Sequence, residues 1–353
     1  MNLCRLSEKL SENQAALIIS PENRRYFTGF DSSDGYLVVS RQGSTFFTDS
    51  RYIEAAEDAI TEADVVLLDR IYGQLEAVIK KYGCNEVLVE TSRITLGEFA
   101  VLRKNMPEFS YSGTRLLDTF ISEIREVKNE EEIVKLGKAQ DIAEKAYLKL
   151  LEIIKPGISE RDVANELEYL MRKFGADGIS FDTIAASGEN SSKPHAVPGD
   201  RVLQNGDFLT IDFGAVFDGY HSDTTRTVAI GEPSEEMKKV YNIVKKAQQA
   251  GVDAIRAGLG VVEYDRVARD IIAAEGYGDA FGHSLGHGVG VEIHEVPFCG
   301  PRGKGELKAG NVISCEPGIY LPGRFGVRIE DMLLVTETGS VNFCHLSRDL
   351  IVL

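Results

Sequence analysis

The sequence lacks the features that mark several large classes of protein. Its 353 residues contain no low-complexity segment and no apolar run long enough to cross a bilayer. The five cysteines are odd in number, scattered, and never arranged as C-x-x-C, which argues against a disulfide framework, a zinc knuckle and redox chemistry. A formal net charge of −16 without a basic block disfavours nucleic acids and anionic membranes as partners. It does not disfavour a metal cation.

The composition is that of a globular protein, with 43% hydrophobic and 27% charged residues. The length exceeds the usual size of a single domain, so we expect two. The first residues, "MNLCRLSEKLSENQ", are polar and lack the apolar run of a secretory signal. We therefore expect a cytoplasmic protein.

Residues 1–122 show an alternation of strand and helix patterns that predicts a compact α/β domain. The expected strands are 15–20, 34–40, 44–50, 64–69 and 86–90, and the segments 51–59, 72–83 and 95–105 alternate with them. The charged segment that follows predicts one long amphipathic helix ended by Pro156-Gly157. The domain boundary is placed at its start, so that residues 123–353 form the second domain.

The second domain contains a faint internal repeat. Residues 155–178 and 256–279 share a glycine entry, an acidic first turn, an apolar helical face and a glycine-rich exit. In the first copy, Ser159 and Asp162 have the spacing of a helix N-cap. A histidine-bearing loop and a hairpin with two acids follow each copy. The acids are Asp212, Asp223, Glu316 and Glu330. If the two copies face each other, the four carboxylates converge on one place.

The first hairpin allows a geometric check. A two-residue turn at Asp218-Gly219 pairs Phe217 with Tyr220. The same register makes Asp212 and Asp223 diagonal neighbours on one face, roughly 7–8 Å apart at the backbone. A buried carboxylate without a partner costs several kcal/mol, on the order of the stability of a domain, and a shared metal removes that cost.

Histidines supply the remaining candidate ligands. Four of the six lie near the acids, namely His195 in "SSKPHAVPGD" and His283, His287 and His294 in "FGHSLGHGVGVEIHEVP". A single histidine among glycines is weak evidence, but this clustering indicates a site. Carboxylates with one imidazole suit Mn²⁺, with Co²⁺, Fe²⁺ or Zn²⁺ as alternatives, because thiolate ligands are absent. Cys315, beside Glu316, faces the other side of its strand and is expected in the core.

The order of these motifs resembles that of a known enzyme family. "IDFG…HSDTTRT", "GHSLGHGVGVEIHEVP", "SCEPGIY" and "GVRIEDM" are similar to the successive motifs of the pita-bread metallopeptidases, M24, and most closely of the proline-specific branch, prolidase and aminopeptidase P. "NRRYFTGFDSSDGYLVVS" and "FTDSRYIEAA" resemble the N-terminal domain of that branch. The resemblance implies an α+β fold: a pita-bread catalytic domain with a pseudo-twofold repeat, preceded by an α/β creatinase/prolidase-like domain.

The resemblance also implies roles for individual residues. Five metal ligands would hold two divalent ions: Asp212 on one ion, His287 and Glu316 on the other, and Asp223 and Glu330 bridging both. A water between the ions would become hydroxide near neutral pH and attack the scissile carbonyl. Glu316 is the expected proton shuttle. The outer histidines His195, His283 and His294 would position substrate and stabilise the oxyanion, and Arg328 would orient carboxylate or substrate groups.

Several activities share this ligand pattern. We expect an Xaa-Pro aminopeptidase, since the chain is short and ends soon after Glu330, with an Xaa-Pro dipeptidase as the alternative. His283, Arg328 and the long N-terminal domain favour proline over the methionine aminopeptidase reading. A non-catalytic pita-bread binding module is expected to have lost ligands, and all five are present. The expected partners are proline-containing peptides and a second copy of the chain, with residues 1–122 at or near the dimer interface.

Overall fold

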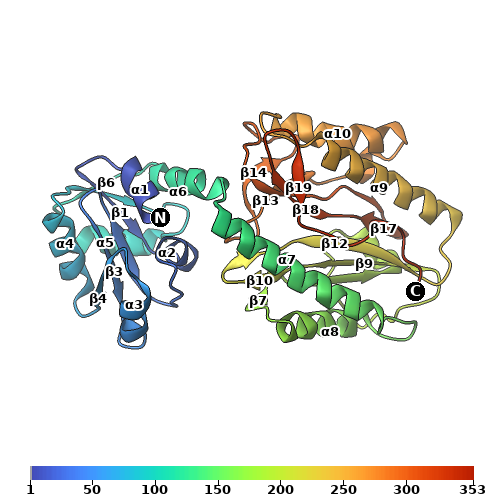
Figure 1. Ribbon diagram of the computed structural model, residues 1–353, viewed down its shortest axis with the longest axis horizontal. Coiled ribbons are helices and arrows are strands. Elements are labelled where there is room, and N and C mark those ends of the chain that lie inside the picture. Colours follow the sequence, from blue (N-terminus) through green and yellow to red (C-terminus); the bar gives the residue numbers. More distant parts are fainter. Residues whose placement is uncertain (1) are drawn as a thin grey trace. The chain divides into compact units, whose positions relative to one another are not determined.

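The computed structural model describes residues 2–353 and divides into two compact units, which meet in the sequence at Arg125 and Glu126 (Figure 1). None of the helices in these residues combines the length and apolarity required to cross a membrane. Both units mix helices with sheets, as the expected α+β fold requires.

The first unit is built on one six-stranded sheet with the order β4-β3-β2-β1-β5-β6. Its strands are β1 (Gln14–Ile18), β2 (Tyr36–Val39), β3 (Ser44–Thr48), β4 (Asp64–Leu67), β5 (Glu86–Val89) and β6 (Ser110–Tyr111). Its helices are α1 (Asn2–Lys9), α2 (Pro21–Thr28), α3 (Ile53–Ala59), α4 (Ile71–Lys81), α5 (Leu96–Asn105) and α6 (Leu116–Glu126). All five strands expected from the pattern form. Helices α1 and α2 were not expected, although Pro21 in the first turn of α2 is a helix-start signal.

The single long helix expected from residue 122 onward is wrong. The chain instead forms α6 and α7 (Glu130–Leu151), with a break at residues 127–129. Asn129 caps α7 through a reciprocal capping box with Glu132, which begins a new helix at this point. Lys128 contacts residues that are distant in the sequence. Its backbone N–H donates to the carbonyl of Gly310, and its ammonium lies 3.2 Å from the buried carboxylate of Glu295. Periodicity cannot reveal such long-range partners.

The second unit consists of two similar halves. The first contains α7, α8 (Glu160–Lys173), β7 (Gly178–Ile179), β8 (Ile184–Ser187), η1 (Gly188–Ser192), β9 (Asp207–Phe213), β10 (Ala215–Phe217), β11 (Tyr220–His221) and β12 (Thr224–Ile230). The second contains α9 (Glu235–Ala254), α10 (Val261–Ala274), η2 (Gly278–Ala280), β13 (Gly286–Gly288), β14 (Glu295–Cys299), β15 (Val312–Cys315), β16 (Gly318–Leu321), β17 (Phe325–Arg328), β18 (Asp331–Val335) and β19 (Ser340–Asn342).

The halves repeat the same arrangement. Helices α8 and α10, the two copies found in the sequence, each have 14 residues, and the N-cap expected at Ser159 is a complete capping box with Asp162. In the first half β9 lies between β8 and β12, and in the second β15 lies between β13 and β18, with every pairing antiparallel. The sheets lie between the pair α7 and α8 and the pair α9 and α10 (Figure 1). Helices α9 and α10 bury their apolar faces in one core, and α7 and α8 bury theirs in another.

Candidate metal centre

The two acidic hairpins place their carboxylates at matching positions. In the first hairpin Phe217 pairs with Tyr220, and the same register continues to the pair of Asp212 and Thr225. The turn and register expected from the sequence are thereby confirmed, with Asp218 in the left-handed conformation at φ 47°. Asp223 directly precedes β12.

The second hairpin repeats this placement. Cys315 pairs with Asp331, so continuing the same register by one residue places Glu316 opposite Glu330. Glu330 directly precedes β18. Cys315 itself is fully buried in the core, as expected from its strand face.

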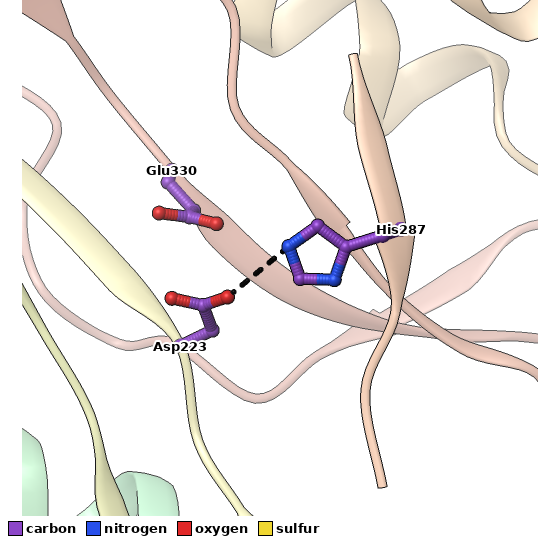
Figure 2. A group of neighbouring side chains, drawn as sticks. All are labelled: Asp223, His287 and Glu330. Carbon is purple, nitrogen blue, oxygen red and sulfur yellow. Dashed lines mark ion pairs between the residues drawn. The ribbon is translucent and has the colours of Figure 1, made fainter. Parts of the chain in front are cut away.

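One histidine joins the acids of both hairpins. Ligand atoms of Asp223, His287 and Glu330 all lie within 4.8 Å of one another, and Figure 2 shows the three side chains pointing toward a common point. Nε2 of His287 lies 3.4 Å from Oδ2 of Asp223 and 3.4 Å from Oε1 of Glu316. The other ring nitrogen, Nδ1, is 3.0 Å from the carbonyl of Gly288, which fixes the proton on Nδ1 and leaves Nε2 as a ligand atom.

The fifth candidate ligand, Asp212, is bound from one side only. Nη2 of Arg328 donates to its Oδ2 at 2.6 Å, and the Arg328 side chain is only 4% exposed. Within residues 2–353, Oδ1 of Asp212 is buried and accepts no hydrogen bond. A buried anionic oxygen without a partner is costly, and a cation bound there would satisfy it.

Burial and neighbouring negative charge favour either protonation of the acids Asp223, Glu316 and Glu330 or the binding of a cation. Burial and the neighbouring carboxylates of Asp212 and Glu316 keep the pKa of Asp223 well above its usual range. Burial, Asp223 and Glu316 do the same for the pKa of Glu330. Burial also raises the pKa of Glu316 to about 8, although the nearby Arg328 opposes the shift. These carboxylates repel one another until protons or cations compensate their charge.

The histidines, in contrast, are held neutral. Burial lowers the pKa of His287 to about 4, with a further contribution from His294. Burial and the charge of Arg328 lower the pKa of His283 to about 4, and burial lowers that of His294. A neutral imidazole retains a lone pair, as metal coordination requires.

The three outer histidines lie around this cluster. The rings of His294 and His287 are 4.4 Å apart, and Nδ1 of His283 lies 3.8 Å from Oε2 of Glu316. His195 is exposed, and the carbonyl of its neighbour Pro194 accepts a hydrogen bond of 3.4 Å from Arg328, which places His195 beside the site. The structure thus gathers all nine residues singled out from the sequence.

Two further residues contact the site, and their roles were not predicted from the sequence. The hydroxyl of Tyr320 accepts from Arg328 at 2.9 Å and lies 2.8 Å from Nε2 of His283. The hydroxyl of Thr225 donates to Oε2 of Glu330 at 2.6 Å and accepts from Arg328 at 3.0 Å. Tyr320 lies within the quoted motif "SCEPGIY" and Thr225 within "HSDTTRT", so their position in the motifs was the available signal.

The donor set fits divalent cations. Four carboxylates and one imidazole, without a thiolate, suit ions such as Mn²⁺, Co²⁺, Fe²⁺ or Zn²⁺. The buried, unpaired Oδ1 of Asp212 and the mutually repelling acids supply unsatisfied negative charge that a bound cation would compensate. Such a site in a twofold-repeated α+β unit defines a metal-dependent hydrolase.

The chain belongs to metallopeptidase family M24. The model of that family matches residues 134–337, and the model of the creatinase/prolidase N-terminal domain matches residues 3–127. The family resemblance, the fold class and the assignment to metallopeptidases are thereby confirmed.

Individual relatives are similar over almost the whole chain. An Xaa-Pro dipeptidase of Pyrococcus horikoshii is 40% identical over 342 residues, which cover 96% of this chain and 94% of that protein. The solved structure of an Xaa-Pro dipeptidase from Bacillus anthracis is 38% identical and superposes with a TM-score of 0.96, covering 100% of this chain and 99% of that one. The structure of an X-Pro aminopeptidase from Thermotoga maritima is 37% identical, with a TM-score of 0.92 and coverage of 98% and 99%.

Proposed function

We propose that this protein is a metal-dependent exopeptidase that hydrolyses the bond between an N-terminal residue and proline, with Xaa-Pro dipeptides as its main substrates. The observation that carries the proposal is the convergence of Asp223, His287 and Glu330 within 4.8 Å. It occurs in a member of family M24 whose relatives include Xaa-Pro dipeptidases.

The proposed ligands divide between two cations. Asp212 would serve as a ligand of one ion and His287 and Glu316 as ligands of the other, and Asp223 and Glu330 would be shared by both. Two bound divalent ions would lower the pKa of a water molecule and polarise the scissile carbonyl. Arg328 holds Oδ2 of Asp212, and the buried Oδ1 accepts no hydrogen bond and can serve as a ligand atom. Thr225 likewise occupies only Oε2 of Glu330.

Glu316 is placed to act on both sides of the reaction. Its Oε1 faces His287 at 3.4 Å, and its Oε2 faces Nδ1 of His283 at 3.8 Å. One oxygen is thus directed to the ligand cluster and the other to the outer histidines. Glu316 therefore accepts a proton from the attacking water and delivers it to the departing proline nitrogen.

The outer histidines bind the substrate around this carboxylate. His195 and His294 are exposed and can donate to a bound peptide and to the oxyanion, whereas His283 is held in place by Tyr320. A bond to proline is a tertiary amide without an N–H, and its ring is rigid and bulky. A site that supplies a proton donor and a shaped edge, instead of an amide acceptor, suits that bond.

The second candidate is an Xaa-Pro aminopeptidase, which releases the first residue from longer peptides. The X-Pro aminopeptidase of Thermotoga maritima supports it, with a TM-score of 0.92 and 99% of its chain covered. Chain length does not separate the two activities, because the match covers 99% of the Bacillus anthracis dipeptidase as well. Substrate length must therefore be tested directly.

The deciding experiment compares three peptides with Mn²⁺ supplied: an Xaa-Pro dipeptide, an Xaa-Pro-Xaa tripeptide and a Met-Ala-Xaa peptide. A dipeptidase cleaves the first with the highest kcat/KM, and an aminopeptidase prefers the second. Preference for the third supports a methionine aminopeptidase. Failure to cleave any of them, with metal bound, supports a non-catalytic binding module.

We also propose the identity of the metal, the cellular location and the oligomeric state. We place Mn²⁺ in the site, because hard carboxylates dominate the ligand set, and the protein in the cytoplasm. Residues 1–122 form the N-terminal domain, which lies at or near the interface of a homodimer, and residues 123–353 form the catalytic domain. Light scattering at working concentration tests the assembly, and a monomer contradicts it.

A further inference from the structure

A buried ion pair on helix α10 has no role in the catalytic scheme described above. Asp265 and Arg269 face each other one helical turn apart: Nε of Arg269 lies 2.7 Å from Oδ2 of Asp265, and Nη2 lies 2.9 Å from Oδ1. The Asp265 side chain is 1% exposed and that of Arg269 is 22% exposed. Two parallel bonds of this kind fix the plane and direction of the guanidinium.

The pair binds the backbone of the loop that carries His283. Nη1 of Arg269 donates to the carbonyl of Phe281 at 2.8 Å, and Nη2 donates to the carbonyl of His283 at 2.7 Å. Oδ1 of Asp265 accepts from the N–H of Leu285 at 3.0 Å. The ion pair therefore holds the loop at every second residue, on both sides of the histidine.

Side-chain contacts also fix the position of the His283 imidazole. The guanidinium of Arg269 lies 4.2 Å from the centre of the Phe281 ring, which meets the His283 ring edge to face at 5.0 Å. On its other side, His283 lies 2.8 Å from the hydroxyl of Tyr320. The ring of His283 is thus fixed between a clamped aromatic residue and a hydrogen-bonding tyrosine.

We call the Asp265–Arg269 pair and its hydrogen bonds to residues 281–285 the clamp. It is also linked to a proposed metal ligand. The carbonyl of Leu285 accepts a hydrogen bond of 2.8 Å from the backbone N–H of Glu316. Movement of the loop away from α10 would displace His283 from Glu316 or break this backbone hydrogen bond. Misplacement by about 1 Å is sufficient to cost roughly 100-fold in rate.

We infer that Asp265 and Arg269 are positioning residues of the reaction, which set the place of His283 relative to Glu316. A buried ion pair adds little net stability compared with apolar residues of the same size, so stability alone does not account for it. Nη1 and Nη2 of Arg269 and Oδ1 of Asp265 also form hydrogen bonds with the loop. The inference rests on the proposed function in that it assigns His283 to substrate binding.

In the first half of the repeat, a buried acid likewise binds the backbone of a loop that carries an outer histidine. Glu160, the first residue of α8, is 1% exposed and accepts from the N–H of Ser187 at 2.7 Å and from that of Gly199 at 3.3 Å. These two residues flank the loop that carries His195. In each half, the helix of the repeated segment uses a buried acid to hold the loop with an outer histidine.

The test uses the full-length protein loaded with Mn²⁺ and three variants. Arg269→Met removes the arginine contacts to the loop, and the double variant Asp265→Asn/Arg269→Gln removes them without leaving a buried charge unpaired. Arg266→Met is the control, since Arg266 is an exposed arginine on the same helix. We expect kcat/KM for the Xaa-Pro dipeptide to fall about 10- to 100-fold in both clamp variants and to be unchanged in the control.

If the clamp only stabilised the fold, its effect on activity would be independent of the effect of replacing His283. We expect the combined variant Arg269→Met/His283→Ala to lose less activity than the product of the two separate losses. Losses that multiply, or clamp variants that fold and retain full kcat/KM, overturn the inference.

A second measurement does not depend on activity. The chain has six histidines, so their ring resonances can be followed by NMR in the metal-free protein. The His283 signals should shift or broaden in both clamp variants and not in Arg266→Met; unchanged signals overturn the inference. If the wild type binds Mn²⁺ but cleaves no Xaa-Pro peptide, the proposed function fails, and the NMR comparison still decides the clamp.

Discussion

Arg328 and Asp212 form a buried ion pair in which Nη2 and Oδ2 are 2.6 Å apart. Arg328 also donates to the hydroxyls of Thr225 and Tyr320, at 3.0 and 2.9 Å. A single guanidinium thus connects a ligand of one hairpin with the residues that hold Glu330 and His283. Its planar fork is suited to three partners in different directions, as an ammonium is not.

Replacement of Arg328 by Met should therefore lower kcat/KM about 10- to 100-fold at saturating metal, because Asp212 loses the contact that orients it. Arg328→Lys should recover only part of this loss, since lysine cannot reach all three partners in one geometry. The measurement is steady-state hydrolysis of an Xaa-Pro dipeptide. Arg324→Met is the control, because Arg324 lies in the same hairpin but is 52% exposed. Equal activity of all four proteins contradicts the prediction.

Replacement of Asp223 by Asn should remove a proposed bridge between two ions. We expect turnover to drop roughly 100-fold or more and bound metal to fall, while the fold is retained. Elemental analysis and activity assays provide the test. Asp218→Asn is the control at the turn of the same hairpin, where asparagine tolerates the left-handed backbone. Near-normal turnover with two metals bound would remove Asp223 from the ligand set.

Metal should be required for activity. After exhaustive chelation the protein should be inactive, and Mn²⁺ or Co²⁺ should restore hydrolysis, because the proposed reaction needs cations to lower the pKa of water and to polarise the carbonyl. Elemental analysis must accompany the assay to establish that the metal was removed. Full activity of metal-free protein would contradict a metallopeptidase mechanism.

Local pattern was sufficient to predict the first hairpin and which acids lie close together. The Asp218-Gly219 turn sets the register, and the register sets which acids share a face, so the neighbourhood of Asp212 and Asp223 follows from short-range rules. The internal repeat then placed Glu316 and Glu330 in the same manner. These inferences succeeded because each depends on turns and alternation within one hairpin.

The failures depend on partners that are distant in the sequence. Periodicity continues across residue 128, but the helix breaks where Asn129 caps α7 and Lys128 pairs with the distant Glu295. Tyr320 gains its role only because β17 brings Arg328 next to it, at 2.9 Å. Asp265 and Arg269 have the spacing of an ordinary surface pair, and only the fold shows that they hold a loop.

The metal-free protein should lose stability between pH 6.5 and 8. The pKa of Glu316 is raised to about 8, so its contribution favours the folded state at low pH and is lost as the pH rises through that value. The lowered pKa values of His283 and His287, about 4, act in the opposite sense, but only below pH 6.5.

For Glu316 alone, the loss across this window is on the order of 1–2 kcal/mol. Urea unfolding of chelated protein at several pH values measures it. Saturating Mn²⁺ should abolish or reverse the trend, because the cation replaces the protons. A metal-free protein whose stability is flat or rises from pH 6.5 to 8 would contradict the electrostatics described for the acidic cluster.

The last prediction concerns proline in the second position of the substrate. A peptide with proline there should be cleaved far faster than the same peptide with alanine, since the tertiary amide needs a proton donor for its nitrogen and no acceptor for an N–H. His283 faces Glu316 at 3.8 Å, on the side away from the ligand cluster. His283→Ala should therefore reduce the preference for proline more than it reduces metal binding. His345→Ala is the control, because His345 is 72% exposed. If the alanine peptide is hydrolysed equally well, or if methionine in the first position decides the rate, the assignment moves to a methionine aminopeptidase.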